Sequence, residues 1–203
     1  MTQLSNNQMT DITSPSLPPS PKPPLLASLS SDGWKLGEIK PGKSMKIATI
    51  TYDAKVPAVR LAESIELRIP FAPSCFGGAD GDRKGCIIAI PQETADVIIE
   101  LEEFVINALK ESTPNIMQIW TSSVKPSEKY PPSLRCKINT GGTRKVKYFN
   151  EDLQPCSEPN NWQQLPVNVC IAIRGVYIQK NNAGLLLDIT HLQYAEVDDY
   201  MPF

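Results

Sequence analysis

Histidine is nearly absent from this 203-residue sequence, in which His191 is the only one. A single imidazole leaves no partner set for Ser–His–Asp or Cys–His catalysis, so we expect no enzymatic activity. Cysteine is scarce as well, and its five positions are far apart: Cys75, Cys86, Cys136, Cys156 and Cys170. Structural zinc sites need ligands in close pairs, and a disulfide framework needs an even set in an oxidising compartment. We therefore expect reduced thiols, no metal site and no cofactor.

The sequence also lacks long hydrophobic runs and a strong charge of either sign. Because no stretch approaches eighteen apolar residues, we expect no membrane span, and the N-terminus does not have the pattern of a secretory signal. A cytoplasmic (intracellular) protein is the resulting expectation. The net charge is −2, from 20 Lys and Arg against 22 Asp and Glu, which argues against uniform coating of duplex nucleic acid. The 41% hydrophobic content is that of a globular chain with a sizeable core.

Proline is concentrated near the N-terminus, where six prolines fall within residues 14–24. Such a segment cannot form a helix or a sheet, and it favours an extended, solvated chain. Its PxxP spacings are also compatible with docking on a partner, but we interpret residues 1–31 as a disordered tail. Residues 32–195 are then the folded domain, and residues 196–203 form an acidic tip.

The folded part reads as many short strands around one helix. Alternating or continuous apolar residues predict strands at 46–52, 64–71, 86–90, 116–124, 134–139, 144–149, 167–178 and 184–194. Residues 92–111 predict an amphipathic helix, with an acidic outer face that includes Glu102. Gly141 and Gly142 predict a hairpin between 134–139 and 144–149. The fold class is therefore mainly β, an OB-fold-like closed or partly open barrel with one inserted amphipathic helix and the disordered N-terminal tail.

Residues 120–149 combine cations with aromatic rings. They contain seven basic residues against one acid, interleaved with Trp120, Tyr130, Tyr148 and Phe149. Single-stranded nucleic acid needs this mixture, because cations follow the phosphates and flat rings stack on exposed bases. Across the predicted hairpin, the cations would share one face of the sheet. An ordinary solvated hairpin would have the same composition, so this alternative stays open.

The chain ends in an acidic run followed by apolar residues: Asp198, Asp199, Tyr200, Met201, Pro202 and Phe203. A terminal Phe carboxylate can enter an apolar pocket of a partner that is rimmed with Arg or Lys. The same acidic residues can also rest in the protein's own cationic groove, or Phe203 can pack on the core. We favour partner binding.

This ending resembles the acidic tip of bacterial single-stranded DNA-binding proteins. The body resembles the small OB-fold single-stranded DNA-binding proteins of phages and other DNA viruses, in segments that together cover roughly residues 116–203: 130–138, 147–150, 173–178 and 183–193. The resemblance implies DNA binding on the barrel face through Lys137, Lys147, Tyr148 and Arg174. It also implies that the tip recruits replication proteins, such as a polymerase, a helicase or a primase.

We therefore hypothesise a single-stranded DNA-binding protein of replication, recombination and repair. Bases would stack on aromatic side chains: Trp120, Tyr130, Tyr148, Phe149 and Tyr177. Phosphates would pair with cations: Arg135, Lys137, Arg144, Lys145, Lys147 and Arg174. The alternative is a non-enzymatic adaptor of a replisome or virion, since OB folds serve many roles. An exposed barrel edge would allow a homo-oligomer, although no residue of the sequence locates it.

Overall fold

A computed structural model describes residues 22–42, 44–74 and 81–195. The predictions for residues 1–21 and for the acidic tip at 196–203 lie outside these residues. Residues 22–31, which the sequence assigned to the tail, lie against the folded part. Leu26 is fully buried, and Arg60 donates hydrogen bonds from its backbone N–H to Pro24 O (2.9 Å) and from Nε to Pro23 O (3.0 Å).

Short strands dominate the structure, and one long helix interrupts them. The strands are β1 (Trp34–Leu36), β2 (Lys40–Pro41), β3 (Lys46–Ala48), β4 (Ile50–Tyr52), β5 (Ala58–Arg60), β6 (Leu67–Ile69), β7 (Arg83–Ala89), β8 (Val124–Lys125), β9 (Ser133–Asn139), β10 (Lys147–Phe149), β11 (Leu165–Ile178) and β12 (Ala183–Tyr194). The helices are η1 (Leu26–Ser28), η2 (Ser31–Gly33), α1 (Gln92–Leu109) and α2 (Ile116–Ile119).

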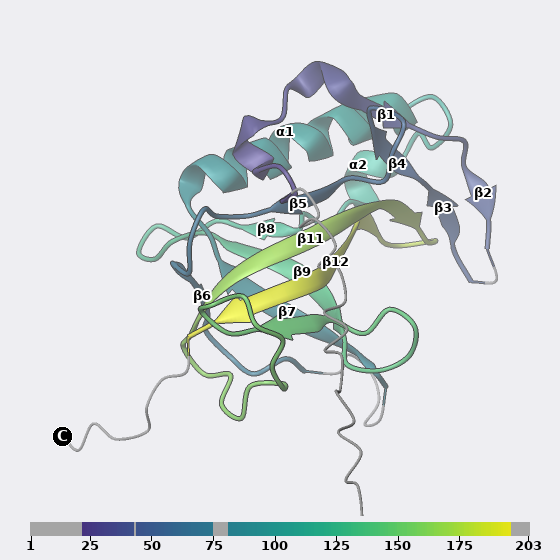
Figure 1. Cartoon of the computed structure of the whole chain (residues 1–203). Helices are drawn as coiled ribbons and strands as arrows, with labels where there is room; N and C mark the ends of the chain where they lie inside the picture. Colours follow the sequence, from purple (N-terminus) through teal and green to yellow (C-terminus); the bar gives the residue numbers. More distant parts are fainter. Residues whose placement is uncertain (1–21, 43, 75–80, 196–203) are drawn as a thin grey trace, which may run out of the picture.

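Five of the strands form a closed ring of pairings, in the order β6–β7–β9–β12–β11 and back to β6 (Figure 1). Four of the five pairings are antiparallel, and the β9–β12 pairing is parallel. A five-stranded ring of this kind is the core of an OB fold. The mainly β, OB-like fold class that the sequence predicts is therefore confirmed.

The longest strand, β11, is paired along both of its edges. One edge carries β12, and the other carries β6, β5 and β3 in succession. Register shifts lie between Cys170 and Ile171, where Thr190 of β12 is the extra residue, and between Ile173 and Gly175, where Arg174 of β11 is the extra residue, so each strand has one bulge. Bulges bend a strand and strengthen its twist, which helps β11 to meet β6, β5 and β3 in succession along one edge.

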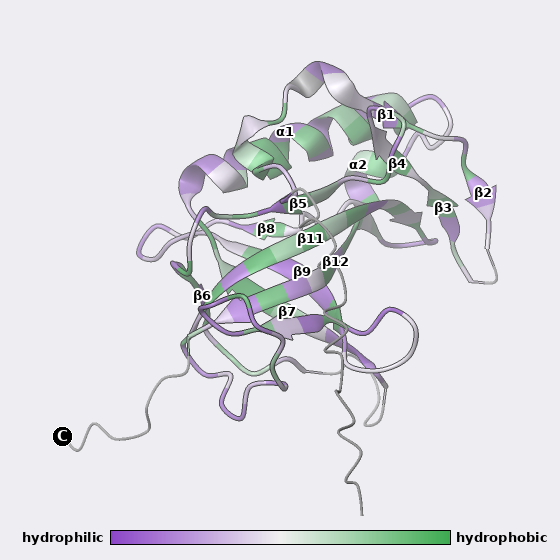
Figure 2. Cartoon of the chain, viewed as in Figure 1, coloured by the Kyte–Doolittle hydropathy of each residue, from purple (hydrophilic) through white to green (hydrophobic). Residues whose placement is uncertain are grey.

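The core lies inside the ring and beneath α1, where apolar residues gather on β11 and on the helix (Figure 2). The helix packs against η1, β1, α2 and β8. Its predicted apolar stripe is present, since Ile98, Leu101, Val105 and Leu109 are all buried. Among the described residues, no helix is both long and apolar enough to cross a membrane.

Glu102 corrects the predicted acidic face of the helix. Its side chain is buried rather than exposed, and Oε1 accepts a hydrogen bond of 2.6 Å from the backbone N–H of Ser123. A buried carboxylate needs such a partner, and the bond in turn fixes the segment that leads into β8.

Two of the predicted strand assignments are wrong. The predicted strand at 116–124 is instead the short helix α2 followed by β8. In the predicted hairpin, β10 pairs with β12 rather than with β9, and both β9 and β10 run parallel to β12 along the same edge. The chain thus leaves β9, turns through 140–146 and continues in the same direction as β10.

Candidate nucleic-acid interface

A hollow of about 700 Å³ lies on the outer face of β7, β9 and the first half of β12. We call it the β7–β9 hollow. It is lined by residues of these three strands and by the loop after β6, the segment before β8, the end of β11 and the turn between β11 and β12. The residues that carry its chemistry are Phe71, Arg135, Lys137, Tyr177 and Asn182.

Arg135 and Lys137 reach this hollow because of the two-residue period of β9. Leu134, Cys136 and Ile138 point into the core and are buried, so the intervening cations point outward. Arg135 is exposed, whereas Lys137 is partly buried. Burial lowers the pKa of Lys137, and Arg83 lowers it further, while Asp188 opposes the shift.

Aromatic rings line the hollow from two separate segments. Tyr177 lines it from β11, and its hydroxyl donates to Asn182 Oδ1 at 3.3 Å. The same oxygen accepts from Thr121 Oγ1 at 2.8 Å, which ties the β11–β12 turn to the segment held by Glu102. Phe71 lines the hollow from the loop after β6 with 65% of its surface exposed. The predicted strand at 64–71, which included Phe71, is too long, because β6 ends at Ile69.

A cluster of charges adjoins the hollow on the same face of the ring. Asp188 is only 3% exposed and lies between two guanidinium groups, with Arg83 Nη2 at 2.8 Å from Oδ1 and Arg174 Nε at 3.3 Å from Oδ2. Lys137 is the register partner of Asp188 on β9. We call these four residues the Asp188 cluster. It holds three cations against one acid, and both arginines keep exposed surface.

The other predicted site residues are more dispersed. Tyr130 is 66% exposed on the loop before β9, with Lys129 Nζ 5.6 Å from its ring centroid. Trp120 is partly buried and is bridged to Ala183, at the start of β12. The cations outside β9 are exposed in the 140–146 turn or on β10: Arg144, Lys145 and Lys147.

Tyr148 corrects the predicted set of stacking residues. It is 5% exposed and packs edge-on against Trp162, with ring centroids 6.2 Å apart. Burial raises the pKa of its hydroxyl, and Glu158 raises it further. Lys147 and Phe149 point outward on β10, so the strand period sends Tyr148 into the core, where 5% exposure leaves little of its ring open to a base.

The fold resembles that of phage single-stranded DNA-binding proteins. It matches gp2.5, a single-stranded DNA-binding protein encoded by bacteriophage T7, with a TM-score of 0.52 and 12% sequence identity over 72% of this chain and 97% of that chain. The single-stranded DNA-binding protein from bacteriophage Enc34 matches with TM-scores of 0.48 for a C-terminal truncation and 0.45 for its complex with single-stranded DNA. These two matches have 12% and 14% identity, and each covers 83% of this chain and 98% of that chain.

At 12% identity, the likeness to the T7 protein shows a shared fold, as the sequence resemblance implies for the body of the domain. No family model and no curated protein matches the sequence.

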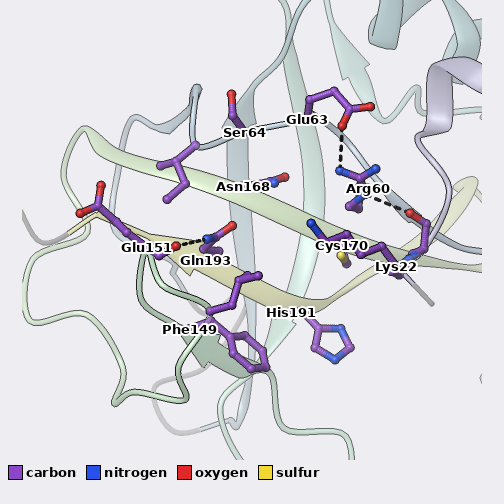
Figure 3. A pocket seen from close by; sticks show the side chains of 13 residues that line it. Lys22, Arg60, Glu63, Ser64, Phe149, Glu151, Asn168, Cys170, His191 and Gln193 are labelled. Atoms are coloured by element: carbon purple, nitrogen blue, oxygen red, sulfur yellow. Dashed lines mark hydrogen bonds and ion pairs between the residues drawn. The ribbon is translucent and has the colours of Figure 1, made fainter. Parts of the chain in front are cut away.

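A second hollow, of about 590 Å³, lies farther along β12 (Figure 3). We call it the Phe149 hollow. Phe149 stacks on His191 with ring centroids 5.9 Å apart and an interplanar angle of 29°. Asn168 and Cys170 of β11 line the hollow beside Gln193, and Arg60 and Glu63 lie across it, joined by a 3.1 Å ion pair. The sequence pattern missed this hollow because its residues come from five separate segments.

Neither hollow has the side chains of a metal centre. Among the described residues, no group of three or more His, Cys, Asp or Glu side chains could hold a metal ion. The thiols bordering the β7–β9 hollow belong to Cys86 and Cys136, which are register partners on β7 and β9. Burial raises the pKa of Cys86 to about 12 and also raises that of Cys136, so both remain protonated thiols at neutral pH.

His191 is expected to make the fold less stable at mildly acidic pH. Burial lowers its pKa below the usual 6.5, and the charge of Lys147 lowers it further. At a pH between the lowered pKa of the folded state and the ordinary value of 6.5, the unfolded chain binds the proton more readily than the folded chain. Folding stability is therefore full above about pH 6.5 and falls as the pH drops below it. We expect urea unfolding between pH 7 and pH 5 to show this decline, and His191→Gln to flatten it. An unchanged slope in the variant would contradict the assignment.

Proposed function

We propose that the chain is a non-enzymatic single-stranded DNA-binding protein that holds its ligand in the β7–β9 hollow. The observation that carries this proposal is that Arg135 and Lys137 line the same hollow as the rings of Phe71 and Tyr177. In chain order, β7 and β9 are the second and third strands of the ring. The face of these two strands, with the loops beside it, is where OB folds bind oligonucleotides. The same residue types on a helix or an isolated loop would carry no such implication.

The chemistry of the hollow suits an unpaired strand. Exposed rings offer stacking surfaces worth about 1–3 kcal/mol per base, and they do so for any base because every base has a π-face. Cations beside the rings neutralise phosphates and release counterions. A duplex presents its stacked bases only at their edges, so it would gain the phosphate interactions but not the stacking.

Fluorescence anisotropy with a labelled oligothymidine of about 30 nucleotides tests the proposal, with a duplex of equal length as the control. We expect preference for the single strand and a log–log salt slope of about −0.7 for each phosphate neutralised. Affinity that does not change with salt would contradict the mechanism. Failure to bind at low salt would favour the adaptor function instead.

We further propose that residues 198–203 recruit replication proteins. The support for this role is chemical, because an acidic run followed by apolar residues suits an apolar pocket rimmed with cations, and because the same acids would compete with DNA for Arg135 and Lys137. Deletion of residues 196–203 is expected to tighten oligothymidine binding at low salt and to abolish capture of a polymerase, helicase or primase. Unchanged affinity together with unchanged capture would contradict this role.

A further inference from the structure

The Phe149 hollow lies on the same strand as the β7–β9 hollow and faces the same side of the ring. Leu186 lines the first hollow, Asp188 carries the charge cluster, and His191 lines the second. Strict alternation would turn His191 inward. A bulge in β12 turns His191 outward instead. Ile171 pairs with Ile189 and Cys170 pairs with His191, which leaves Thr190 as the extra residue.

This register places the two hollows close enough for one strand of DNA to reach both. From Leu186 to His191 the rise of β12 is roughly 16 Å, at about 3.3 Å per residue. Beyond Lys137, which lines the first hollow, Arg83 and Arg174 are paired with Asp188 on the strand between the two hollows. Cations therefore stand between two hollows, which is the order of groups that a strand of bases and phosphates requires.

The lining of the Phe149 hollow suits a base better than a phosphate. Its floor has the stacked rings of Phe149 and His191, and the Asn168 Oδ1 atom is buried with no hydrogen-bond partner among the described residues. The hollow is lined by two cations, Lys22 and Arg60, against two acids, Glu63 and Glu151, and Arg60 is paired with Glu63 and also donates to Pro23 O. Because the acids balance the cations and the Arg60 guanidinium is already engaged, the hollow offers a base a planar surface and an unpartnered amide oxygen, without the net positive charge that would favour a phosphate.

We propose that a strand held in the β7–β9 hollow continues over the Asp188 cluster and places a base in the Phe149 hollow. The base stacks on the Phe149–His191 pair and meets the side-chain amide of Asn168. This inference rests on the proposed function, because it extends the path of the same ligand along β12.

Cys170 provides a direct test, because its thiol lines the Phe149 hollow and is partly exposed. The full chain is treated with N-ethylmaleimide with and without an unlabelled oligothymidine of about 20 nucleotides, which exceeds the span of one OB fold. Peptide mass spectrometry then gives the modification rate of each cysteine. We expect the oligonucleotide to slow modification of Cys170 at least fivefold, and to leave Cys156, which is also partly exposed but lies outside the lining, unchanged.

The outcomes separate this inference from the proposed function. Salt-sensitive binding by anisotropy with no protection of Cys170 would overturn the Phe149 hollow as a base site and leave the β7–β9 hollow intact. Absence of any binding would overturn both. Equal protection of Cys156 would point to a general change in the protein, and it would also overturn the assignment.

A substitution gives a second, independent measurement. Phe149→Leu keeps an apolar side chain but removes the stacking face, so we expect affinity for the 20-mer to fall about fivefold or more. The salt slope should stay the same, because every phosphate-neutralising cation is still present. The matched control is Met117→Leu, which changes an exposed apolar residue of α2 outside both hollows and should leave the affinity unaltered. Wild-type affinity in Phe149→Leu would overturn the inference.

Discussion

The double substitution R135E/K137E is expected to weaken binding of oligothymidine by at least a hundredfold at moderate salt. Both side chains point from β9 into the β7–β9 hollow, so the change converts two phosphate-neutralising groups into two that repel phosphate. The salt slope should become shallower by about 1.4, which is 0.7 for each phosphate that is no longer neutralised. Anisotropy titrations at several salt concentrations measure both quantities.

A matched control separates a local site from a general field. K35E/K110E makes the same change in net charge at two exposed lysines, one on β1 and one directly after α1, neither of which lines a hollow. We expect less than about a threefold loss, because neither lysine lines the hollow and salt screens exposed charges. An equal loss in both variants would show that total charge, and not the β7–β9 hollow, governs binding. Arg83 remains near position 137, which helps the folded state to accept a carboxylate there.

The sequence alone identifies the parts of this fold that depend on local pattern. The helix at 92–111 is observed as Gln92–Leu109, and the strands predicted at 167–178 and 184–194 form the β11–β12 hairpin. Both depend on periodicity and on a turn within the same segment. The position of β10 depends instead on a parallel partner more than forty residues away, which no local pattern specifies. The Gly141–Gly142 pair is a good turn signal, but it does not indicate which strand follows β9 along the sheet.

The candidate site shows the same division. Alternation with apolar residues on one strand predicts that Arg135 and Lys137 share a face, and the structure places both in the β7–β9 hollow. The alternation of Lys147, Tyr148 and Phe149 also predicts that Tyr148 points inward. The prediction that Tyr148 stacks on a base relied instead on the number of aromatic residues in this segment. The role of Asp188 could not be predicted from the local sequence, because it depends on ion pairs to Arg83 and Arg174. The ion pair to Arg83 joins residues that are 105 positions apart.

Gly175→Ala is expected to cost about 3 kcal/mol or more of folding stability. Gly175 has a φ of +144°, a backbone conformation that side chains other than glycine rarely adopt. A Cβ at this position would also overlap the carbonyl oxygen of Ala48, where β3 pairs with β11. Strand β11 would have to give up either its bulge at Arg174 or its pairing with β3.

For a chain of this size, such a loss lowers the melting temperature by roughly 6–12 °C, which calorimetry or thermal circular dichroism would measure. Gly142→Ala is the matched control, because Gly142 also has a positive φ, of +71°, but a Cβ there would meet no atom within 4 Å. Its cost is the backbone term alone, about 1 kcal/mol. Similar losses in the two variants would mean that the close approach of β3 to β11 contributes little. A much larger loss at Gly175 would show that the close approach of β3 to β11, beside the bulge that carries Arg174, contributes strongly to the stability of the fold.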